Sequence, residues 1–147
     1  MVSDRHGMTL VESLTVVVMV GLLTLAGLPP VRKAIESNRA RRAATIVALD
    51  LEQAFTLASR QRRPVRLSCD CSNARYTITD QSAGTVYVQR SFAGDSDFRL
   101  GALTFSTASV TIYPRGVASE PLTVTVAAGA STHQITVTTA GVVRITQ

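Results

Sequence analysis

The sequence has few of the residues that bind metals or carry out acid–base and nucleophilic catalysis. Among its 147 residues only two are histidine, His6 and His133, and only two are cysteine, Cys69 and Cys71. The histidines are distant from the cysteines and no Cys-x-x-Cys pair occurs, which disfavours a metal site. The sequence also has no carboxylate pair at helical spacing, no nucleophile elbow and no glycine-rich phosphate loop. We therefore expect no metal, no cofactor and no enzymatic activity, with His133 in a structural or surface role.

Charged residues are also scarce, at 17% of the chain, whereas 46% of the residues are hydrophobic and the mean hydropathy is +0.21. The apolar excess lies in residues 8–28, where Glu12 is the only charged residue. A helix of this length rises about 30 Å, which is the thickness of a bilayer core. We predict a transmembrane helix over residues 8–30, preceded by a polar segment, residues 1–7, that is typical of a targeting leader.

A second helical segment is predicted over residues 31–63, after Pro29 and Pro30. Because proline lacks the backbone donor and clashes with the preceding turn, the pair should kink or break the helix. Beyond it, apolar residues recur at spacings of three and four and predict a face that packs on a sheet. These residues are Ala43, Val47, Leu51, Ala54 and Ala58, with Ala44, Ala48 and Phe55 beside them. Pro64 should end the helix.

Residues 64–147 have the texture of a β-rich domain: short runs of Val, Ile, Thr and Tyr separated by Gly, Asn, Asp and Ser. The predicted strands are 65–69, 76–79, 85–90, 103–106, 110–114, 122–127, 133–139 and 142–146. Apolar residues alternate with threonine in 122–126 and 135–138, so one face of these strands should be buried. Glycine turns favour antiparallel connections. The predicted class is α+β, with a long helix packed on antiparallel sheet.

A basic block occupies residues 32–66. It holds nine Lys and Arg residues against three acidic ones, a net charge of +6, while the rest of the chain is about neutral. Such a block attracts anionic lipid headgroups, nucleic acid or an acidic partner. It is equally typical of a solvated helix face beside a membrane.

The two cysteines, Cys69 and Cys71, are separated by one residue. On an extended strand their side chains share a face with their α-carbons about 6.6 Å apart, near the upper limit for a disulfide. A bridge in an oxidising compartment such as the periplasm and two free thiols both remain open.

The segment Arg5-His6-Gly7-Met8-Thr9-Leu10-Val11-Glu12 resembles the class III leader of type IV pilins. The resemblance implies that a prepilin peptidase cuts between Gly7 and Met8 and that the new N-terminus, Met8, is methylated. Glu12 then becomes the fifth mature residue, and in this family it pairs with the terminal amine of an adjacent subunit. Pro29 falls where pilins of this type often have a helix-kinking proline. Met8 replaces the commoner phenylalanine and His6 the usual lysine.

The rest of the chain is similar to the GspH/FimT family of minor pilins and pseudopilins. The similar stretches are residues 41–67, residues 111–116, residues 134–137 and residues 141–145. The resemblance implies a pilin-like fold and a subunit of a type II secretion pseudopilus or a type IV pilus. The implied partners are other pilins or pseudopilins, the prepilin peptidase and the bacterial inner membrane. The globular domain would lie in the periplasm or another extracytoplasmic space, and in the filament after assembly.

Two alternatives remain open. Some FimT-like pilins are DNA receptors with a C-terminal Gly-Arg-x-Arg motif; here Gly141 and Arg144 match, Val142 replaces the first arginine, and Arg115 is a further candidate contact. One clear cation should bind phosphates weakly, because affinity grows with the number of contacts. The other alternative is a single-pass anchored β domain that never polymerises. An N-terminus at Met1, or at Gly27 after an ordinary signal cleavage, would indicate this form.

Overall fold

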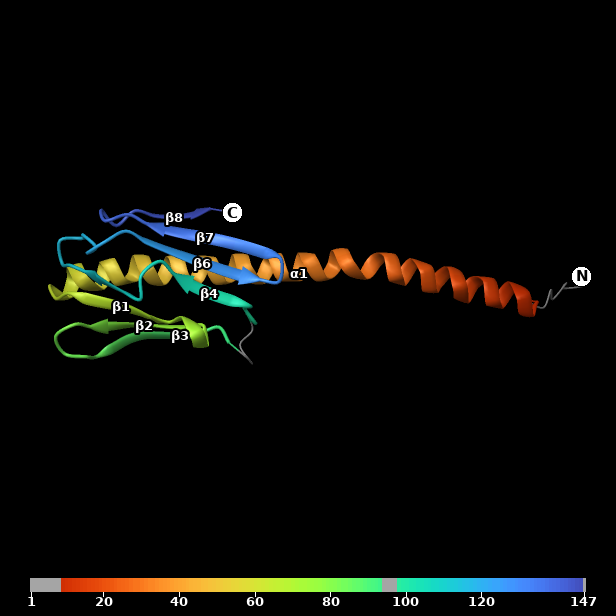
Figure 1. The fold of residues 1–147 in the computed structure, drawn as a ribbon, viewed down its shortest axis with the longest axis horizontal. Coiled ribbons are helices and arrows are strands. Elements are labelled where there is room, and N and C mark those ends of the chain that lie inside the picture. Colours follow the sequence, from red (N-terminus) through yellow and green to blue (C-terminus); the bar gives the residue numbers. More distant parts are fainter. Residues whose placement is uncertain (1–8, 94–97, 147) are drawn as a thin grey trace, which may run out of the picture. The chain divides into compact units, whose positions relative to one another are not determined.

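The structure, a computed structural model, describes residues 9–93 and 98–146, except for the side chains of residues 25–29. The chain divides into two compact units, residues 1–34 and residues 35–147 (Figure 1). Its elements are α1 (Leu10–Gln61), β1 (Val65–Asp70), the 3-10 helix η1 (Cys71–Asn73), β2 (Arg75–Asp80), β3 (Val86–Ser91), β4 (Ala102–Phe105), β5 (Ser109–Ile112), β6 (Leu122–Ala128), β7 (Ser131–Val137) and β8 (Val143–Thr146). The predicted α+β class is confirmed, with a long helix packed on antiparallel sheets.

Helix α1 continues through Pro29 and Pro30. Helical backbone runs without interruption from Leu10 to Gln61, so of the two predicted effects of these prolines, a kink or a break, the break is wrong. The φ that the proline ring fixes, about −65°, is itself helical, so the backbone can remain helical although each proline lacks one hydrogen-bond donor and crowds the preceding turn. Among the residues described, no helix meets the length and hydropathy needed to cross a membrane.

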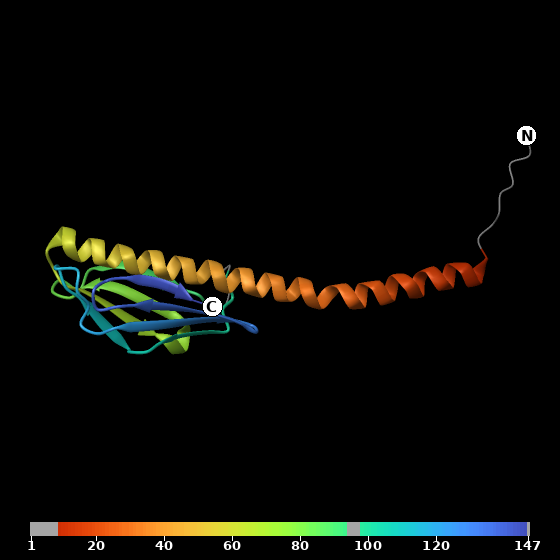
Figure 2. The same cartoon turned by 90° about the horizontal axis from the view of Figure 1, so that it is seen from above.

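The second half of α1 supplies one wall of the core of the globular unit, residues 35–147. Figure 2 shows the strands of this unit gathered on one side of that half of the helix. The predicted apolar face is confirmed, because its alanines, Val47 and Leu51 are all buried and Phe55 is half-buried. Small alanine side chains on this face allow the strands to approach the helix closely.

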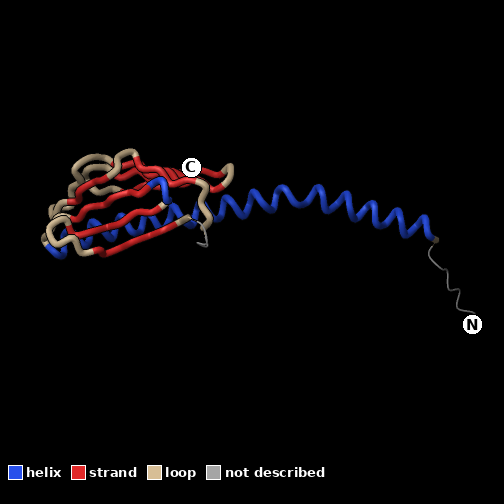
Figure 3. Tube along the Cα trace, turned by 60° about the horizontal axis from the view of Figure 1, so that its bottom comes forward, coloured by secondary structure: helices blue, strands red, loops and turns tan. Residues whose placement is uncertain are grey.

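The strands form two four-stranded antiparallel sheets (Figure 3). The first has the order β3-β2-β1-β5 and the second the order β4-β6-β7-β8. Strand β4 therefore belongs to the second sheet although β5, the next strand along the chain, returns to the first. All eight predicted strands are present, with ends that differ by a few residues.

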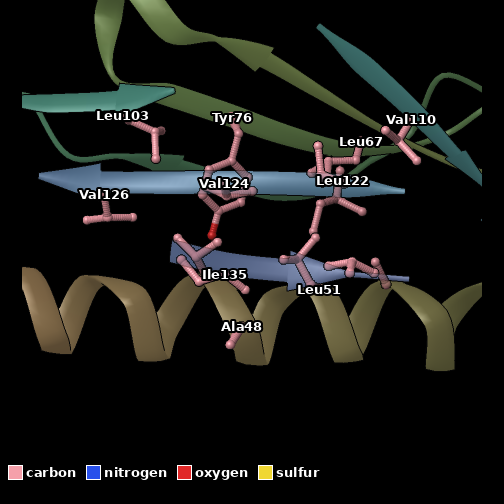
Figure 4. Close-up of a cluster of buried hydrophobic side chains, with 14 of the residues drawn as sticks. Ala48, Leu51, Leu67, Tyr76, Leu103, Val110, Leu122, Val124, Val126 and Ile135 are labelled. Carbon is pink, nitrogen blue, oxygen red and sulfur yellow. The ribbon is translucent and has the colours of Figure 1, made fainter. Parts of the chain in front are cut away.

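The predicted alternation along β6 and β7 is confirmed. Leu122, Val124 and Val126 are buried while the threonines between them are partly exposed. In the antiparallel register Val124 lies opposite Ile135, and Val126 opposite His133. Figure 4 shows side chains of β6 and β7 directed toward Ala48 and Leu51 of α1, together with Tyr76 of β2. The core therefore joins both sheets to the helix.

Candidate functional site

The predicted cleavage point, Gly7 and Met8, lies outside the described residues, and so does the side chain of Pro29. The first described residue, Thr9, lies just before the start of α1. Its hydroxyl oxygen accepts a hydrogen bond from the backbone N–H of Glu12 over 3.3 Å, and its carbonyl oxygen accepts one from the N–H of Ser13 over 3.1 Å. Thr9 thus caps the helix immediately after the predicted cleavage point.

Glu12 lies in the first turn of α1 and its side chain is exposed. Thr9 and Glu12 have the Thr-x-x-Glu spacing of a capping box, and an acidic residue in this turn interacts favourably with the positive end of the helix dipole. A carboxylate at this position therefore suits the first turn of the helix.

The first unit presents an uncovered apolar helix surface. Leu10 is 83% exposed and Leu23 is 72% exposed, and the large apolar residues between them are exposed on every side of the helix. These residues include Val11, Leu14, Val17 and Leu22. A contiguous apolar surface of this kind needs a lipid or protein environment.

Cys69 and Cys71 form a disulfide in the structure, with their α-carbons 5.2 Å apart. The separation is shorter than that of an extended strand, because β1 ends at Asp70 and η1 begins at Cys71. The Asp70 carboxylate accepts hydrogen bonds from Asn73 Nδ2 (2.8 Å) and Ser72 Oγ (2.9 Å). These bonds lower the pKa of Asp70 and fix the bend.

The two candidate DNA contacts lie near a pair of adjoining turns. Arg115 is exposed in a turn closed by a hydrogen bond from the N–H of Gly116 to the carbonyl of Tyr113. The second turn contains Gly141, at φ +79°, and a Cβ added there would lie 3.2 Å from the carbonyl oxygen of Gly116. Arg144 follows on edge strand β8 and is exposed. The structure therefore places the Arg115 turn beside the glycine of the partial motif.

A buried polar network that the sequence pattern did not predict joins α1 to β2 and β3. Asp50 is only 3% exposed and accepts hydrogen bonds from Tyr76 Oη (2.6 Å), Arg90 Nε (2.8 Å) and Arg90 Nη2 (3.2 Å). Burial and the neighbouring Asp50 carboxylate raise the pKa of Tyr76, while the same carboxylate raises the pKa of Arg90. A sequence signal existed, since Asp50 follows Val47 by three residues and precedes Ala54 by four on the buried face.

A second buried carboxylate, Asp80, organises the turn between β2 and β3. It accepts hydrogen bonds from the backbone N–H groups of Ser82 (2.7 Å) and Ala83 (2.8 Å) and from Tyr87 Oη (3.0 Å). The bond from Ala83 is the largest of the causes that lower the pKa of Asp80. Both buried carboxylates are thus satisfied by donors, as structural groups in a protein core are.

His133 is buried on β7, so of the two expected roles the structure favours the structural one. Within residues 9–93 and 98–146 no three His, Cys, Asp or Glu side chains are grouped as metal ligands are. Most arginines of the basic block, among them Arg41, Arg42 and Arg66, are exposed, while Arg63 lies 3.8 Å from the Asp80 carboxylate. The block therefore forms a solvated charged surface on the helix and the strand that follows it.

The fold resembles two solved structures at low sequence identity. The type IV minor pilin FimU of Pseudomonas aeruginosa aligns with a TM-score of 0.60 and 14% identity, over 75% of this chain and 90% of that one. The minor pseudopilin EpsH from the Type 2 Secretion System of Vibrio cholerae aligns with a TM-score of 0.57 and 15% identity, over 74% of this chain and 96% of that one. No curated protein matches the sequence significantly.

The sequence itself matches the model of a protein family. The family is described as type II transport protein GspH, and the match covers residues 43–141, from the buried face of α1 to the turn before β8. This is about two thirds of the chain and includes the whole first sheet and every strand of the second except β8. The chain therefore belongs to the GspH family and has the pilin-like fold of FimU and EpsH.

Proposed function

We propose that this protein is a minor pilin or pseudopilin that joins a type II secretion pseudopilus or a type IV pilus through its N-terminal helix. The observation that carries the proposal is the uncovered apolar surface of α1 with a single acidic side chain, Glu12, in its first turn. Before assembly a bilayer would cover this surface, and in a filament neighbouring helices would do so. The role is structural rather than catalytic.

The proposed precursor is inserted in the inner membrane through residues 8–30. A prepilin peptidase cuts it between Gly7 and Met8, and Met8 is then N-methylated. The globular unit lies on the periplasmic side, where an oxidising environment preserves the disulfide between Cys69 and Cys71. Other pilins or pseudopilins are the partners in the filament.

Glu12 is proposed to pair with the terminal amine of Met8 on an adjacent subunit. A charged side chain at the centre of a membrane helix costs about 2.5–3.5 kcal/mol, and Glu12, near one end, would meet a smaller cost that a positive partner removes in part. Since cleavage creates the amine four residues before Glu12, the pairing becomes possible only after processing. It would set the axial register between subunits.

Replacing Glu12 tests this pairing. We expect Glu12→Ala and Glu12→Gln to insert into the membrane and to be processed normally, yet to be depleted from sheared filaments or to reduce secretion. The control is Glu52→Gln, a carboxylate exposed on the same helix within the globular unit. Normal incorporation of both Glu12 variants would refute the assembly role of this side chain.

The second candidate function is DNA capture, and the observation that favours it is the contact between the Arg115 turn and the Gly141 turn. An electrophoretic shift assay of the full chain in non-ionic detergent would test it, with Arg144→Gln as the variant. For DNA capture we expect an affinity that falls as salt is added and falls again when the charge of Arg144 is removed. Absent or salt-insensitive binding would rule this function out.

A further inference from the structure

Strand β8 is an open edge of the second sheet. In the order β4-β6-β7-β8 it has one neighbour, and among the residues that the structure describes β7 is the only strand paired with it. Figure 1 shows β8 along the outer margin of the globular unit. An edge strand offers a row of unpaired N–H and C=O groups, to which another extended chain can pair.

The register shows which backbone groups of this edge are open. The N–H of Thr138 donates a hydrogen bond to the carbonyl of Val142 over 3.0 Å, and the pairs of β7 with β8 continue from this one without a shift. Because bonded and non-bonded pairs alternate in an antiparallel ladder, Arg144 bonds to β7, whereas Val143 and Ile145, on either side of it, do not. The backbone N–H and C=O groups of Val143 and Ile145 therefore point away from β7.

The other edges of the two sheets are covered or interrupted, which is how native proteins prevent unwanted pairing. The segment 117–119 covers the outer side of β5, where the N–H of Ser119 donates to the carbonyl of Thr111 over 2.8 Å. A register shift interrupts the pairing of β3 with β2, and β4 lies beside η1. Strand β8 has neither a register shift nor a proline, and its Ile145 is 46% exposed. This edge therefore has the features of a pairing site.

We propose that β8 binds an extended segment of a partner protein as an additional, antiparallel strand of this sheet. The partner residues opposite Val143 and Ile145 would exchange backbone hydrogen bonds with them. They would be aliphatic, because Val143 and Ile145 share a face with the buried Ile135 and Val137 that they oppose. The residue between them would face Arg144 in a non-bonded pair, with α-carbons about 4.5 Å apart. An acidic residue suits this place, since opposite charges across a pair stabilise a sheet.

A second copy of this chain fits the edge less well than a different protein. The symmetric pairing that uses all the open groups places Val143 opposite Ile145 of the other copy and Arg144 opposite Arg144. Like charges directly opposite destabilise a sheet. A shifted register moves the partner of one open residue past an end of β8.

A phosphate-bearing ligand fits less well for another reason. Phosphates of lipids and nucleic acids accept hydrogen bonds, so they cannot satisfy the open carbonyls of Val143 and Ile145. An extended peptide supplies donors and acceptors at the spacing of the edge. All these groups lie in the globular unit, so the proposal does not rest on the assembly role of α1.

Fluorescence anisotropy with labelled peptides tests the proposal on the full chain in non-ionic detergent micelles. The probe has the core Thr-Val-Glu-Val-Thr. N-methylation of its two valines removes the N–H groups that would bond to β8, whereas N-methylation of the glutamate and the last threonine alters two that point away. We expect the first modified peptide to bind about tenfold more weakly than the probe, and the second to bind within about twofold of it.

An exchange of charges tests the predicted register. Arg144→Glu should weaken binding of the glutamate probe and strengthen binding of a probe with lysine in its place. The matched control is Arg66→Glu, which changes an exposed arginine on β1 and should alter either affinity by no more than about twofold. In the complex with the glutamate probe, hydrogen exchange should slow at the backbone N–H groups of Val143 and Ile145.

Several results would overturn the proposal. These are absence of peptide binding, equal loss of affinity in the two N-methylated peptides, and a charge exchange at Arg144 that has no more effect than the one at Arg66. Dimerisation of the chain that protects Val143 and Ile145 without peptide would overturn it in favour of a second copy. Binding of oligothymidine that depends on Arg144, with no peptide binding, would overturn it in favour of a nucleic acid.

Discussion

Replacing Tyr76 with phenylalanine removes a single hydroxyl from the buried network around Asp50. The Tyr76 hydroxyl donates to Asp50 Oδ2 over 2.6 Å, and Arg90 supplies the carboxylate's two other hydrogen bonds. The ring would keep its contacts with Phe92 and Phe105, whose centroids lie 5.9 and 6.0 Å away. The substitution therefore changes one hydrogen bond while conserving the packing of the core.

The expected loss at neutral pH is about 2 kcal/mol, since a hydrogen bond to a charged group contributes about 1.5–3 kcal/mol net. The loss depends on pH because burial and the hydrogen bond to Asp50 raise the pKa of Tyr76 above its ordinary value of 10.0. A raised folded pKa means that the neutral hydroxyl stabilises the fold fully below pH 10 and progressively less above it. The difference between wild type and variant should narrow above about pH 10, by at most about 1.4 kcal/mol per pH unit.

Urea unfolding of the full chain in non-ionic micelles, followed by circular dichroism, measures both effects. The free energy of unfolding is extrapolated at pH 7 and again above pH 10 for the two proteins. Tyr113→Phe is the control, because Tyr113 is 47% exposed. Its hydroxyl should contribute no more than about 0.5 kcal/mol.

Two outcomes would refute the reasoning. If Tyr76→Phe is no less stable than Tyr113→Phe at pH 7, the hydroxyl does not support the buried carboxylate. If the deficit of Tyr76→Phe stays constant as pH rises above 10, the fold does not hold this side chain in its neutral form.

Two further predictions concern the disulfide and the turn carboxylate. Replacing Cys69 and Cys71 together with serine should cost at most about 1.6 kcal/mol, because a three-residue loop restrains the unfolded chain only slightly; a loss well above this in urea unfolding would contradict the estimate. In the wild type the lowered pKa of Asp80 stabilises the fold above pH 3.8, and this contribution is lost as the pH falls through the folded pKa. Asp80→Asn lacks this titration, so its free energy of unfolding should fall less steeply below about pH 4. If the acid transition of this variant matches that of the wild type, the hydrogen bonds from backbone N–H groups to the Asp80 carboxylate are not coupled to folding.

Much of the fold could be predicted because the determining information is local. Alternation of apolar residues with threonine marks β6 and β7, and the spacing of alanines with Val47 and Leu51 marks the buried face of α1. The division of the strands into two sheets was not predictable in this way. It depends on pairings between distant segments, such as Val65 of β1 with Ile112 of β5.

Other errors arose where the structure overrides a local preference. Pro29 and Pro30 disfavour a helix locally, yet α1 continues through both. Asp50 is one of the three acidic residues of the basic block, and its position between Val47 and Ala54 on the apolar face indicates burial. Its partners Tyr76 and Arg90 are 26 and 40 residues away in sequence, so no spacing rule could identify them.

The candidate site residues likewise divide into those that a local motif identifies and those that only the folded chain brings together. The leader, with Gly7, Met8 and Glu12, is a linear motif that can be recognised in the sequence. A hollow lined by Arg39, Arg42 and Phe98 cannot be recognised from the sequence, because Phe98 lies in a loop and meets the helix face only in the folded unit. The sequence identified the basic block but could not show that part of it adjoins an apolar wall.

The central claim is that α1 is the processed, polymerising helix of a minor pilin or pseudopilin. Mass spectrometry of the N-terminal peptide of the native protein, purified from its membrane or filament, tests it most directly. We predict a mature chain that begins at Met8 and has an N-methyl group on its terminal amine. A functional protein that begins at Met1 or at Gly27 would contradict the claim.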